Sequence, residues 1–558
     1  TASGDLVEIS PFILARDLNA AERKITRREP EPGSAPPEGG LRHLVEAITA
    51  AARRSDTAVE PILCAELPSE LDYDRIAPDN ENAGDQGAAF AISDLPEDRA
   101  QRVRRWTPGA DGNVLVVGGS PAERWTALTT LFVAVTDAMP PAQLHGYMID
   151  CAANRADETS VLESLAACGA VATADDPDRI VRVLARLTAE LDARSSGGAT
   201  AASPKVVLFV NEVTAFLRML ELAGELEQGR DMLERIVGKG PLHGISTVMS
   251  TAGEQGVPAR LLGQFQQRVL LHLGDRSAYR ALDIDSARIP TEVAARAITV
   301  PDLVEIQIAA IGDLFATVAA RRDRDTDVDG PDTVPRTPPV VHTEELRKMT
   351  EFSDGRWHIP VGLDTRSLEP TMLRLTAPAG GLILGDSGTG KSTVLMNIAR
   401  CVSNIDSGVD VHAIAATWSP LALLPHLSSA TTLAGIDKWA AEFFDRTDRH
   451  RLVLVDDADR LDGPVFERLA ALDDPRLVVI AAGRTRVLEL PAHWTAPFRR
   501  SRAAVLLRPL AGDAAMFGLY LRTTSTLPGV GRGFVVDDDT ITPVLLAAPG
   551  DDHEVDGR

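Results

Sequence analysis

The residues with the clearest chemistry lie in the stretch GDSGTGKST, which begins at Gly385. The spacing of Gly385, Gly390, Lys391 and Ser392 is that of a P-loop, in which glycine-rich backbone N–H groups surround phosphates. The lysine of such a loop reaches the β- and γ-phosphate oxygens, and the serine hydroxyl can bind Mg²⁺. We therefore expect ATP and Mg²⁺ as ligands, with nucleotide contacts from Gly385, Asp386, Ser387, Gly388, Thr389, Gly390, Lys391, Ser392 and Thr393.

The stretch RLVLVDDAD ends an apolar run with adjacent acids. A carboxylate at the end of a buried strand beside a P-loop suits a metal-bound nucleotide, so Asp456 and Ser392 are the predicted Mg²⁺ ligands. Asp457 stands where many such enzymes have a glutamate that polarises water. We predict it as the water-activating residue, with Lys391 as the other catalytic residue. Aspartate is one methylene shorter than glutamate, and a misplacement of a catalytic group by about 1 Å costs on the order of 100-fold in rate. The sequence therefore leaves undecided whether this loop hydrolyses ATP.

A second stretch, GGSPAERWT, has the same layout with altered residues. Glu123 takes the position of the second glycine, Arg124 that of the lysine and Trp125 that of the serine. On the matching acidic strand, VVLFVNEV, Asn211 replaces the metal-side aspartate while Glu212 remains. Each change weakens phosphate or metal contacts. The sequence predicts that this copy neither hydrolyses ATP nor binds it tightly.

The elements that position these residues follow from the pattern around them. Short β-branched runs alternate with longer helical patterns, which is typical of a mostly parallel sheet flanked by helices. The order of runs recurs after a charged, proline-rich stretch, so the chain contains an internal duplication. We predict an α/β fold with two tandem P-loop domains: residues 93–320 with the degenerate loop (module one) and 346–550 with the intact loop (module two).

The remaining segments are predicted to connect domains. Residues 1–92 have little apolar periodicity and fit a connector after a preceding domain, and the start of the chain resembles a cut edge. Residues 321–345, which include RRDRDTDVDGPDTVPRTPPVV, are predicted to be an exposed linker.

Composition limits the possible functions. The chain has 558 residues and a net charge of −23, which gives no general electrostatic case for nucleic-acid binding. Its four cysteines show neither metal-ligand nor disulfide spacing and fit a reducing cytoplasm. The scattered His243, His272 and His412 fit core or surface roles better than metal ligation.

Three arginines near the later strands are candidates for a different role. Arg268, Arg484 and Arg502 are positioned in the sequence to act as fingers on a neighbour's nucleotide, because such residues are often supplied in trans. Surface arginines are common, and a plain surface role is the more frequent outcome.

Three stretches resemble the FtsK/SpoIIIE family of P-loop ATPases: GDSGTGKS, the closing turn PGVGRGF, and GISTVMSTAGEQGVPARLLGQFQQRVLLHLGD. The sequence looks most like the C-terminal ATPase modules of EccC, the type VII (ESX) secretion motor protein. This resemblance implies RecA-like domains, an upstream ATPase module, attachment to the cytoplasmic face of the cell membrane through an upstream region, possible hexamers, and recognition of small helical-hairpin substrates of the WXG100 type.

Three functions stay open. In the first, module two binds MgATP in a secretion ATPase and module one serves regulation or substrate docking. In the second, the chain is a fragment of an FtsK-type DNA translocase, although nucleic acid is an unlikely partner for so acidic a chain. In the third, both modules form an interaction scaffold without hydrolysis. Whether the chain is an active ATPase is left undecided by the sequence.

Overall fold

The computed structural model describes residues 45, 48–50, 65–80, 87–152, 155–198, 203–223, 226–282, 284–285, 288–324, 329–403, 405, 408–445, 448–521 and 531–549. Most of the predicted connector and residues 528–530 of the closing turn lie outside these ranges. Residues 65–558 form one compact unit, within which each module is built on its own sheet.

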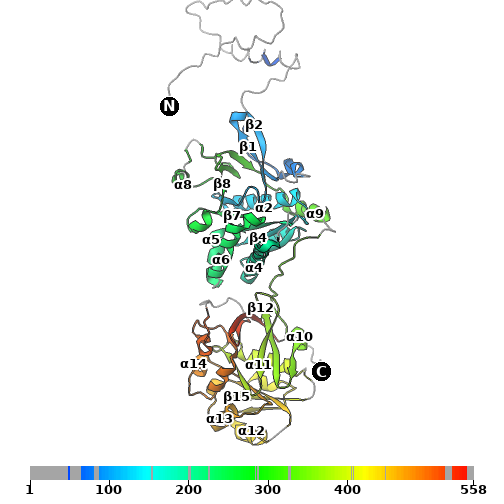
Figure 1. Ribbon diagram of the computed structural model, residues 1–558, viewed down its shortest axis with the longest axis vertical. Helices are drawn as coiled ribbons and strands as arrows, with labels where there is room; N and C mark the ends of the chain where they lie inside the picture. The colour runs from blue at the N-terminus through cyan, green and yellow to red at the C-terminus, as the bar shows by residue number, and fades with distance from the viewer. Residues whose placement is uncertain are drawn as a thin grey trace, which may run out of the picture. The chain divides into compact units, whose positions relative to one another are not determined.

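In its described residues, module one has a sheet of ten strands in the order β2-β1-β10-β9-β8-β3-β7-β6-β4-β5 (Figure 1). The run from β8 to β5 is parallel, and β9, β10, β1 and β2 extend it in antiparallel fashion. The strands are β1 (Ala88–Leu95), β2 (Ala100–Trp106), β3 (Val114–Val117), β4 (Leu144–Asp150), β5 (Cys168–Thr173), β6 (Lys205–Asn211), β7 (Ile245–Thr251), β8 (Gln267–Leu271), β9 (Arg296–Val300) and β10 (Glu305–Ile308).

Module two repeats this order in its described residues as β11-β12-β21-β20-β19-β14-β18-β17-β15-β16, with β13 also paired to β12. The run from β19 to β16 is parallel. The strands are β11 (Glu351–Ser353), β12 (Arg356–Asp364), β13 (Pro370–Thr376), β14 (Ala379–Leu384), β15 (Val409–Ala415), β16 (Ser429–Thr432), β17 (His450–Asp456), β18 (Leu477–Gly483), β19 (Ala503–Leu507), β20 (Arg532–Asp537) and β21 (Thr540–Leu546).

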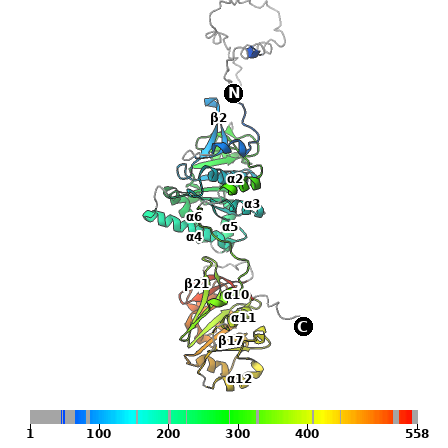
Figure 2. The same ribbon diagram turned by 90° about the vertical axis from the view of Figure 1, so that its right-hand side faces the viewer.

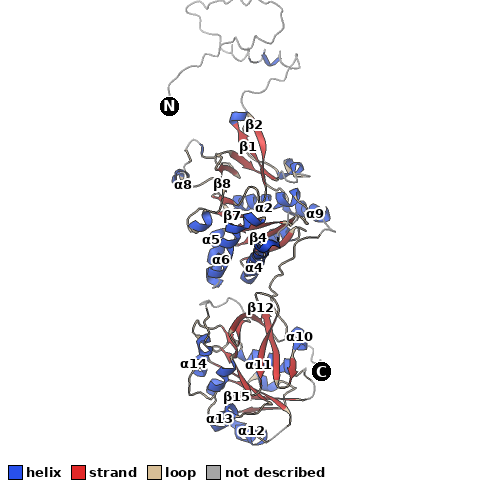
Figure 3. Ribbon diagram, in the orientation of Figure 1, coloured by secondary structure: helices blue, strands red, loops and turns tan. Residues whose placement is uncertain are grey.

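The two sheets correspond strand for strand across their parallel cores. In module one β3 lies between β7 and β8, and in module two β14 lies between β18 and β19. The central strands β7 and β18 are buried along their whole length, because helices cover both of their faces. Figure 3 shows helices around the strands of each module. The predicted fold class and the internal duplication are confirmed.

Helices α2, α3 and α9 of module one share one hydrophobic core with one sheet face, while α4, α5 and α6 share a second core with the other. Figure 2 shows α4, α5 and α6 grouped together. The helices of this module are α2 (Pro121–Ala138), α3 (Ala156–Glu163), α4 (Pro177–Ala193), α5 (Val213–Ala223), α6 (Leu226–Lys239), α7 (Ala259–Leu262), α8 (Arg276–Ala281) and α9 (Leu314–Arg324).

Module two is also packed on both sheet faces. Helix α11 forms one core with the sheet, and α12, α13 and α14 adjoin the core of the opposite face. The helices are α10 (Thr343–Leu346), α11 (Lys391–Val402), α12 (Ile436–Phe443), α13 (Pro464–Ala471) and α14 (Thr485–Leu488). Helix α11 begins where the P-loop ends, as the P-loop pattern requires.

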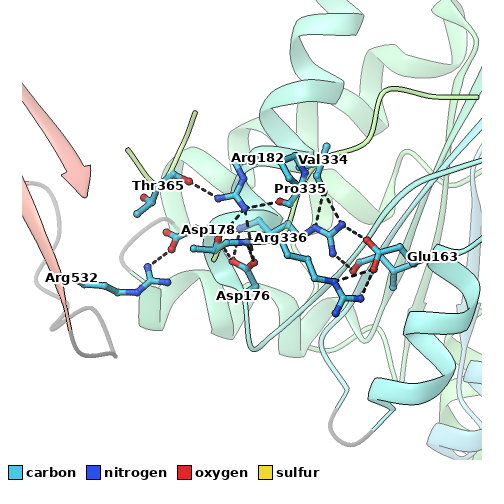
Figure 4. Close-up of polar contacts among 12 residues, drawn as sticks. Glu163, Asp176, Asp178, Arg182, Val334, Pro335, Arg336, Thr365 and Arg532 are labelled. Carbon is cyan, nitrogen blue, oxygen red and sulfur yellow. Dashed lines mark hydrogen bonds and ion pairs between the residues drawn. The ribbon is translucent and has the colours of Figure 1, made fainter. Parts of the chain in front are cut away.

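The described part of the linker is exposed at most positions, and its contacts with module one centre on the buried Val334. Val334 is buried, its N–H donates to Gly169 O over 3.0 Å, and its carbonyl accepts from Arg179 Nε over 2.9 Å. Arg182, 7% exposed, donates to Pro335 O over 2.9 Å. Figure 4 shows Arg182 directed at the carbonyl of Pro335. Linker carbonyls thus supply part of the hydrogen bonding of two buried guanidinium groups, so the segment binds module one.

Candidate nucleotide-binding sites

The intact loop of module two leaves the carboxyl end of β14 at Gly385. Gly385 N donates to Gly483 O of β18 over 3.3 Å, which fixes the start of the loop between two central strands. Lys391 is buried and its Nζ donates to Asp386 O over 2.8 Å, and Thr389 Oγ1 donates to the same oxygen over 2.8 Å. The lysine thus folds back over its own loop.

The backbone of this loop has the free donors that a phosphate needs. Within the described chain, the N–H groups of residues 386–393 donate to no acceptor. Gly388 and Gly390 have φ values of 77° and 99°, and a Cβ added at either would meet nothing within 4 Å. Unpaired N–H groups at the start of a helix form an anion site. The loop therefore fits a nucleotide phosphate chain.

The two predicted acids of module two lie at the same edge of the sheet. Asp456 is the last residue of β17 and is 3% exposed, and its Oδ2 accepts from Ser419 Oγ over 2.6 Å. Asp457 follows in the left-handed region with φ 53°, and its side chain is 41% exposed. Because the carboxyl ends of parallel strands share one edge, β14, β18 and β17 bring loop and acids to the same side.

The corresponding loop of module one has a different conformation. Gly118 N donates to Thr251 O over 3.0 Å, the counterpart of the bond between Gly385 and Gly483. Helix α2 then begins at Pro121, three residues after Gly118, whereas α11 begins six residues after Gly385. Three positions that form loop in module two have therefore become the first turn of a helix.

A capping box causes this early helix start. Ser120 Oγ accepts from Glu123 N over 3.2 Å, and Glu123 Oε2 accepts from Ser120 N over 2.7 Å. Glu123 Oε1 also accepts from Ala295 N over 3.1 Å. The glutamate carboxylate thus takes up N–H groups that a phosphate would need.

Hydrogen bonding also lowers the pKa of Glu123. Burial alone would raise this pKa, but the N–H and hydroxyl of Ser120 and the N–H of Ala295 together hold it below the usual value. The loop of module one consequently carries its own anion. A bound triphosphate would have to displace that carboxylate and would be repelled by its charge.

Arg124, at the lysine position, is used internally. Its Nη1 donates to Gly118 O over 2.9 Å and to Gly119 O over 2.6 Å, and its Nε donates to Glu212 Oε1 over 2.6 Å. The Arg124 side chain is 4% exposed and that of Glu212 is 14% exposed. The cation at the lysine position is therefore neutralised by the acid that corresponds to Asp457.

The metal-side positions of module one are also occupied by other contacts. Trp125 Nε1 donates to Glu158, and Asn211 Nδ2 donates to Asp150 Oδ1 over 2.8 Å. Asn211 Oδ1 accepts from Ser250 Oγ over 2.7 Å. Burial raises the pKa of Asp150. These amide, hydroxyl and indole contacts leave the module-one site without the hydroxyl and carboxylate pair that Mg²⁺ needs.

A cavity of about 1020 Å³ adjoins the module-one loop. Its lining includes Gly119, Ser120, Glu123, Ala295 and Gln307. Three further carboxylates and one arginine also line it: Glu70, Asp72, Glu292 and Arg75. A space of nucleotide size therefore exists here, but its acidic lining is unfavourable for phosphates.

The three candidate finger arginines lie at different edges. Arg268 follows the first residue of β8 and donates to Glu254 Oε1 over 2.7 Å, and Arg502 directly precedes β19 and donates to Phe517 O. Both positions are at the amino ends of parallel strands, opposite the loops. Arg484 directly follows β18, at the loop edge of its own module.

Sequence reasoning missed the capping box of module one, although its signal is local. Ser120, Pro121 and Glu123 hold the N-cap, N1 and N3 positions that favour a helix start. Aligning the stretch on the P-loop pattern assigned these residues to a loop and concealed the signal. The contact between Asp459 and Arg484 in module two had no such local signal, since it joins different strands.

The tandem sheets and their loops define the class of protein as P-loop ATPase modules. The model of the FtsK/SpoIIIE family matches residues 89–298. Module one is therefore an FtsK/SpoIIIE-family domain, as the resemblance predicted.

Curated relatives are proteins of ESX secretion systems. The chain is 22% identical over 373 residues to ESX-1 secretion system protein EccCb1 of Mycobacterium tuberculosis, which covers 60% of this chain and 61% of that protein. It is 25% identical over 341 residues to ESX secretion system protein EccC of Thermomonospora curvata, covering 55% of this chain and 25% of that protein. The predicted resemblance to EccC is confirmed, although the chain spans only part of each relative's length.

Solved structures with the same tandem arrangement support the fold. EssC ATPases 2 and 3 from Geobacillus thermodenitrificans align with a TM-score of 0.61 at 17% identity, over 87% of this chain and 100% of that one. Thermomonospora curvata EccC ATPases 2 and 3, in complex with a signal sequence peptide, align with a TM-score of 0.58 at 20% identity, over 83% and 92%. At these identities the likeness shows the fold.

Within the described ranges, no helix combines the length and the apolar character needed to cross a bilayer.

Proposed function

We propose that this chain forms the ATP-binding and regulatory modules of a type VII secretion ATPase similar to EccC. Module two binds MgATP, and module one serves regulation or substrate docking without a nucleotide of its own. The contrast between the loops carries this proposal. Residues 386–393 have unpaired N–H donors, whereas the module-one loop is closed by Glu123 and Arg124.

The residues of module two divide the work of holding MgATP. The N–H groups of the loop and Lys391 hold phosphate oxygens, and Ser392 and Asp456 are the metal ligands. When bound, Mg²⁺ neutralises phosphate charge. Ser419 keeps Asp456 oriented by donating to Oδ2. Asp457 is the residue that would orient water, and its exposure and short side chain make turnover slow.

A binding titration tests the nucleotide part. A fluorescent ATP analogue with Mg²⁺ is titrated against the wild-type chain, Lys391→Ala and Arg124→Ala. The expected result is one site per chain, which is lost in Lys391→Ala and kept in Arg124→Ala. Binding that survives Lys391→Ala but disappears with Arg124→Ala would contradict the assignment of the two sites.

The secretion part rests on the relatives. The similar EccC structure of Thermomonospora curvata is a complex with a signal sequence peptide. Curated relatives of the present chain are ESX secretion proteins. We therefore propose small helical-hairpin substrates of the WXG100 type as partners, together with an upstream ATPase module and membrane components of the secretion system. Fluorescence anisotropy with a labelled C-terminal peptide of such a substrate tests this part. Equal binding of a scrambled peptide would argue against it.

Asp457 supports one alternative, an interaction scaffold that binds ATP without hydrolysing it. Phosphate release measured with and without the substrate peptide distinguishes the two functions. Release that depends on both the peptide and Lys391 supports the ATPase, whereas nucleotide binding with no release supports the scaffold.

A further inference from the structure

Arg484 directly follows β18 of module two. This strand lies between β14, which precedes the P-loop, and β17, which ends in Asp456. The residue before it, Gly483, accepts the hydrogen bond from Gly385 N that starts the loop. Arg484 therefore leaves the sheet between the loop and the metal-side acid. In P-loop proteins the terminal phosphate lies between the loop lysine and the metal.

Asp459 holds Arg484 in this place. Its Oδ1 accepts from Arg484 N over 3.2 Å and its Oδ2 accepts from Arg484 Nε over 2.6 Å. The side chain of Asp459 is 3% exposed, while that of Arg484 is 49% exposed. Gly483 allows this contact, because a Cβ there would lie 3.1 Å from both Asp459 N and Oδ1. The buried carboxylate thus anchors the inner end of an exposed guanidinium.

The anchor uses only part of the guanidinium. The side-chain hydrogen bond runs through Nε, and within the described chain Nη1 and Nη2 make no hydrogen bond. Asp459 raises the pKa of Arg484 most strongly, and Asp457 and Asp386 raise it further. Asp386 belongs to the P-loop, so the negative charges of the loop and of Asp457 act on the guanidinium of Arg484. Two free NH₂ groups on a fixed plane suit phosphate oxygens.

Module one lacks both members of this pair. Thr251 occupies the position of Gly483, because each accepts from the first loop glycine, and the next residue is Ala252. Asn211 and Glu212 correspond to Asp456 and Asp457, which places Thr214 at the position of Asp459. The arginine and its anchor are thus found in the module whose loop is open and are replaced in the module whose loop is closed.

We propose that Arg484 contacts the γ-phosphate of the nucleotide on its own P-loop and gives module two its preference for ATP over ADP. This inference rests on the proposed MgATP site. It differs from a finger acting in trans, because the residue and the loop belong to the same sheet. Asp459 is its positioning residue.

The test compares two nucleotides on the full chain. Isothermal titration calorimetry with Mg²⁺ measures Kd for ADP and for AMP-PNP, which keeps a γ-phosphate and resists hydrolysis. The variants are Arg484→Ala and Arg484→Gln. Arg476→Ala is the matched control, since Arg476 directly precedes β18, has a 44% exposed side chain and also pairs with an aspartate, but lies at the opposite edge.

We expect both Arg484 variants to weaken AMP-PNP binding by about 10- to 100-fold, the range for a charge-assisted hydrogen bond. ADP binding should change by less than about threefold, as for the loss of an exposed charge. Arg476→Ala should change neither Kd. Melting temperatures without nucleotide check that each variant is folded.

Three results would overturn the inference, and they are distinguishable. An equal loss for both nucleotides would mean that Arg484 only supports the structure. Unchanged discrimination in folded Arg484 variants, with binding that still depends on Lys391, would remove the inference and leave the proposed function intact. Absence of binding of either nucleotide to the wild-type chain would remove both.

Discussion

Arg124 and Glu212 form a buried ion pair in module one, with 2.6 Å between Nε and Oε1. In module two the same positions are occupied by Lys391 and Asp457, whose side chains do not contact each other in this way. The cation and the acid at the positions for which we propose a nucleotide role in module two therefore neutralise each other in module one. Together with Glu123, this pair is part of the internal hydrogen bonding of the module-one loop.

The first prediction concerns the stability contributed by this pair. Arg124→Ala should lower the free energy of unfolding of module one by about 3–5 kcal/mol, because it leaves a largely buried carboxylate without its partner. Hydrogen exchange of module-one peptides in increasing urea measures the change. Arg235→Ala, which breaks an exposed pair with Asp192, is the control and should cost about 1 kcal/mol or less. Equal costs for both variants would contradict a role for burial.

The second prediction concerns Glu123 and pH. The native pKa of this carboxyl lies below the usual value, so its contribution to stability is present above the unfolded pKa of about 4.3 and is lost as pH falls through the native pKa. Glu123→Gln should therefore lower the melting temperature of module one at neutral pH. The difference in melting temperature between Glu123→Gln and wild type should shrink as the pH falls below the unfolded pKa of about 4.3.

The control for this experiment is Glu221→Gln, a change at an exposed position of α5. It should leave the melting temperature within error throughout the pH range. A constant difference between Glu123→Gln and wild type at every pH would show that the carboxylate charge is not what holds the loop.

The third prediction concerns metal binding in module two. Asp456→Asn should reduce the gain in ATP affinity that Mg²⁺ provides, because an amide is a weaker ligand for this cation than a carboxylate. Titration of ATP with Mg²⁺ and with EDTA measures the ratio of the two Kd values. We expect this ratio to fall by about tenfold, the usual effect of losing one charged contact. Ser419→Ala, which removes only a hydrogen bond to Asp456, should have a smaller effect in the same direction.

The fold was predictable because most of the parallel strands are local runs rich in apolar residues. The stretch LHGYMID coincides with β4, and the stretch KVVLFVN forms β6. Strand β5, Cys168–Thr173, was missed because its alanines and glycine carry little β-propensity. Its place depends on pairing with β4 and on the linker across it, and neither is visible in a local window.

The sites were predictable only as far as their motifs are local. The spacing of the P-loop places Lys391 and the loop amides together without reference to the rest of the chain. The contact between Arg124 and Glu212 joins residues 88 positions apart, and that between Asp459 and Arg484 joins residues 25 positions apart. Such pairs are set by the order of strands in the sheet. The sequence pattern names the candidates, and the topology decides which of them meet.

The last prediction concerns His412 of β15, whose side chain packs against α12. Its Nδ1 is 2.7 Å from Ser429 Oγ, and its ring packs edge-on against Phe443 at 5.0 Å. Burial, opposed by the charge of Asp410 and assisted by that of Arg451, lowers the pKa of His412 to about 4. The unfolded chain therefore binds a proton at this residue more readily than the folded one. Stability is complete above the unfolded pKa of about 6.5 and falls as pH decreases towards 4.

The loss should reach about 3 kcal/mol at the acidic end of this window, from about 1.4 kcal/mol for each unit between the two pKa values. Hydrogen exchange of module-two peptides across the window measures it. His412→Asn, which keeps a polar group near Ser429 but cannot be protonated, should flatten the dependence. His358→Asn, at a 41% exposed side chain of β12, should leave it unchanged. If His412→Asn keeps the full slope, another group is responsible for the acid sensitivity, because no proton uptake at position 412 remains to produce it.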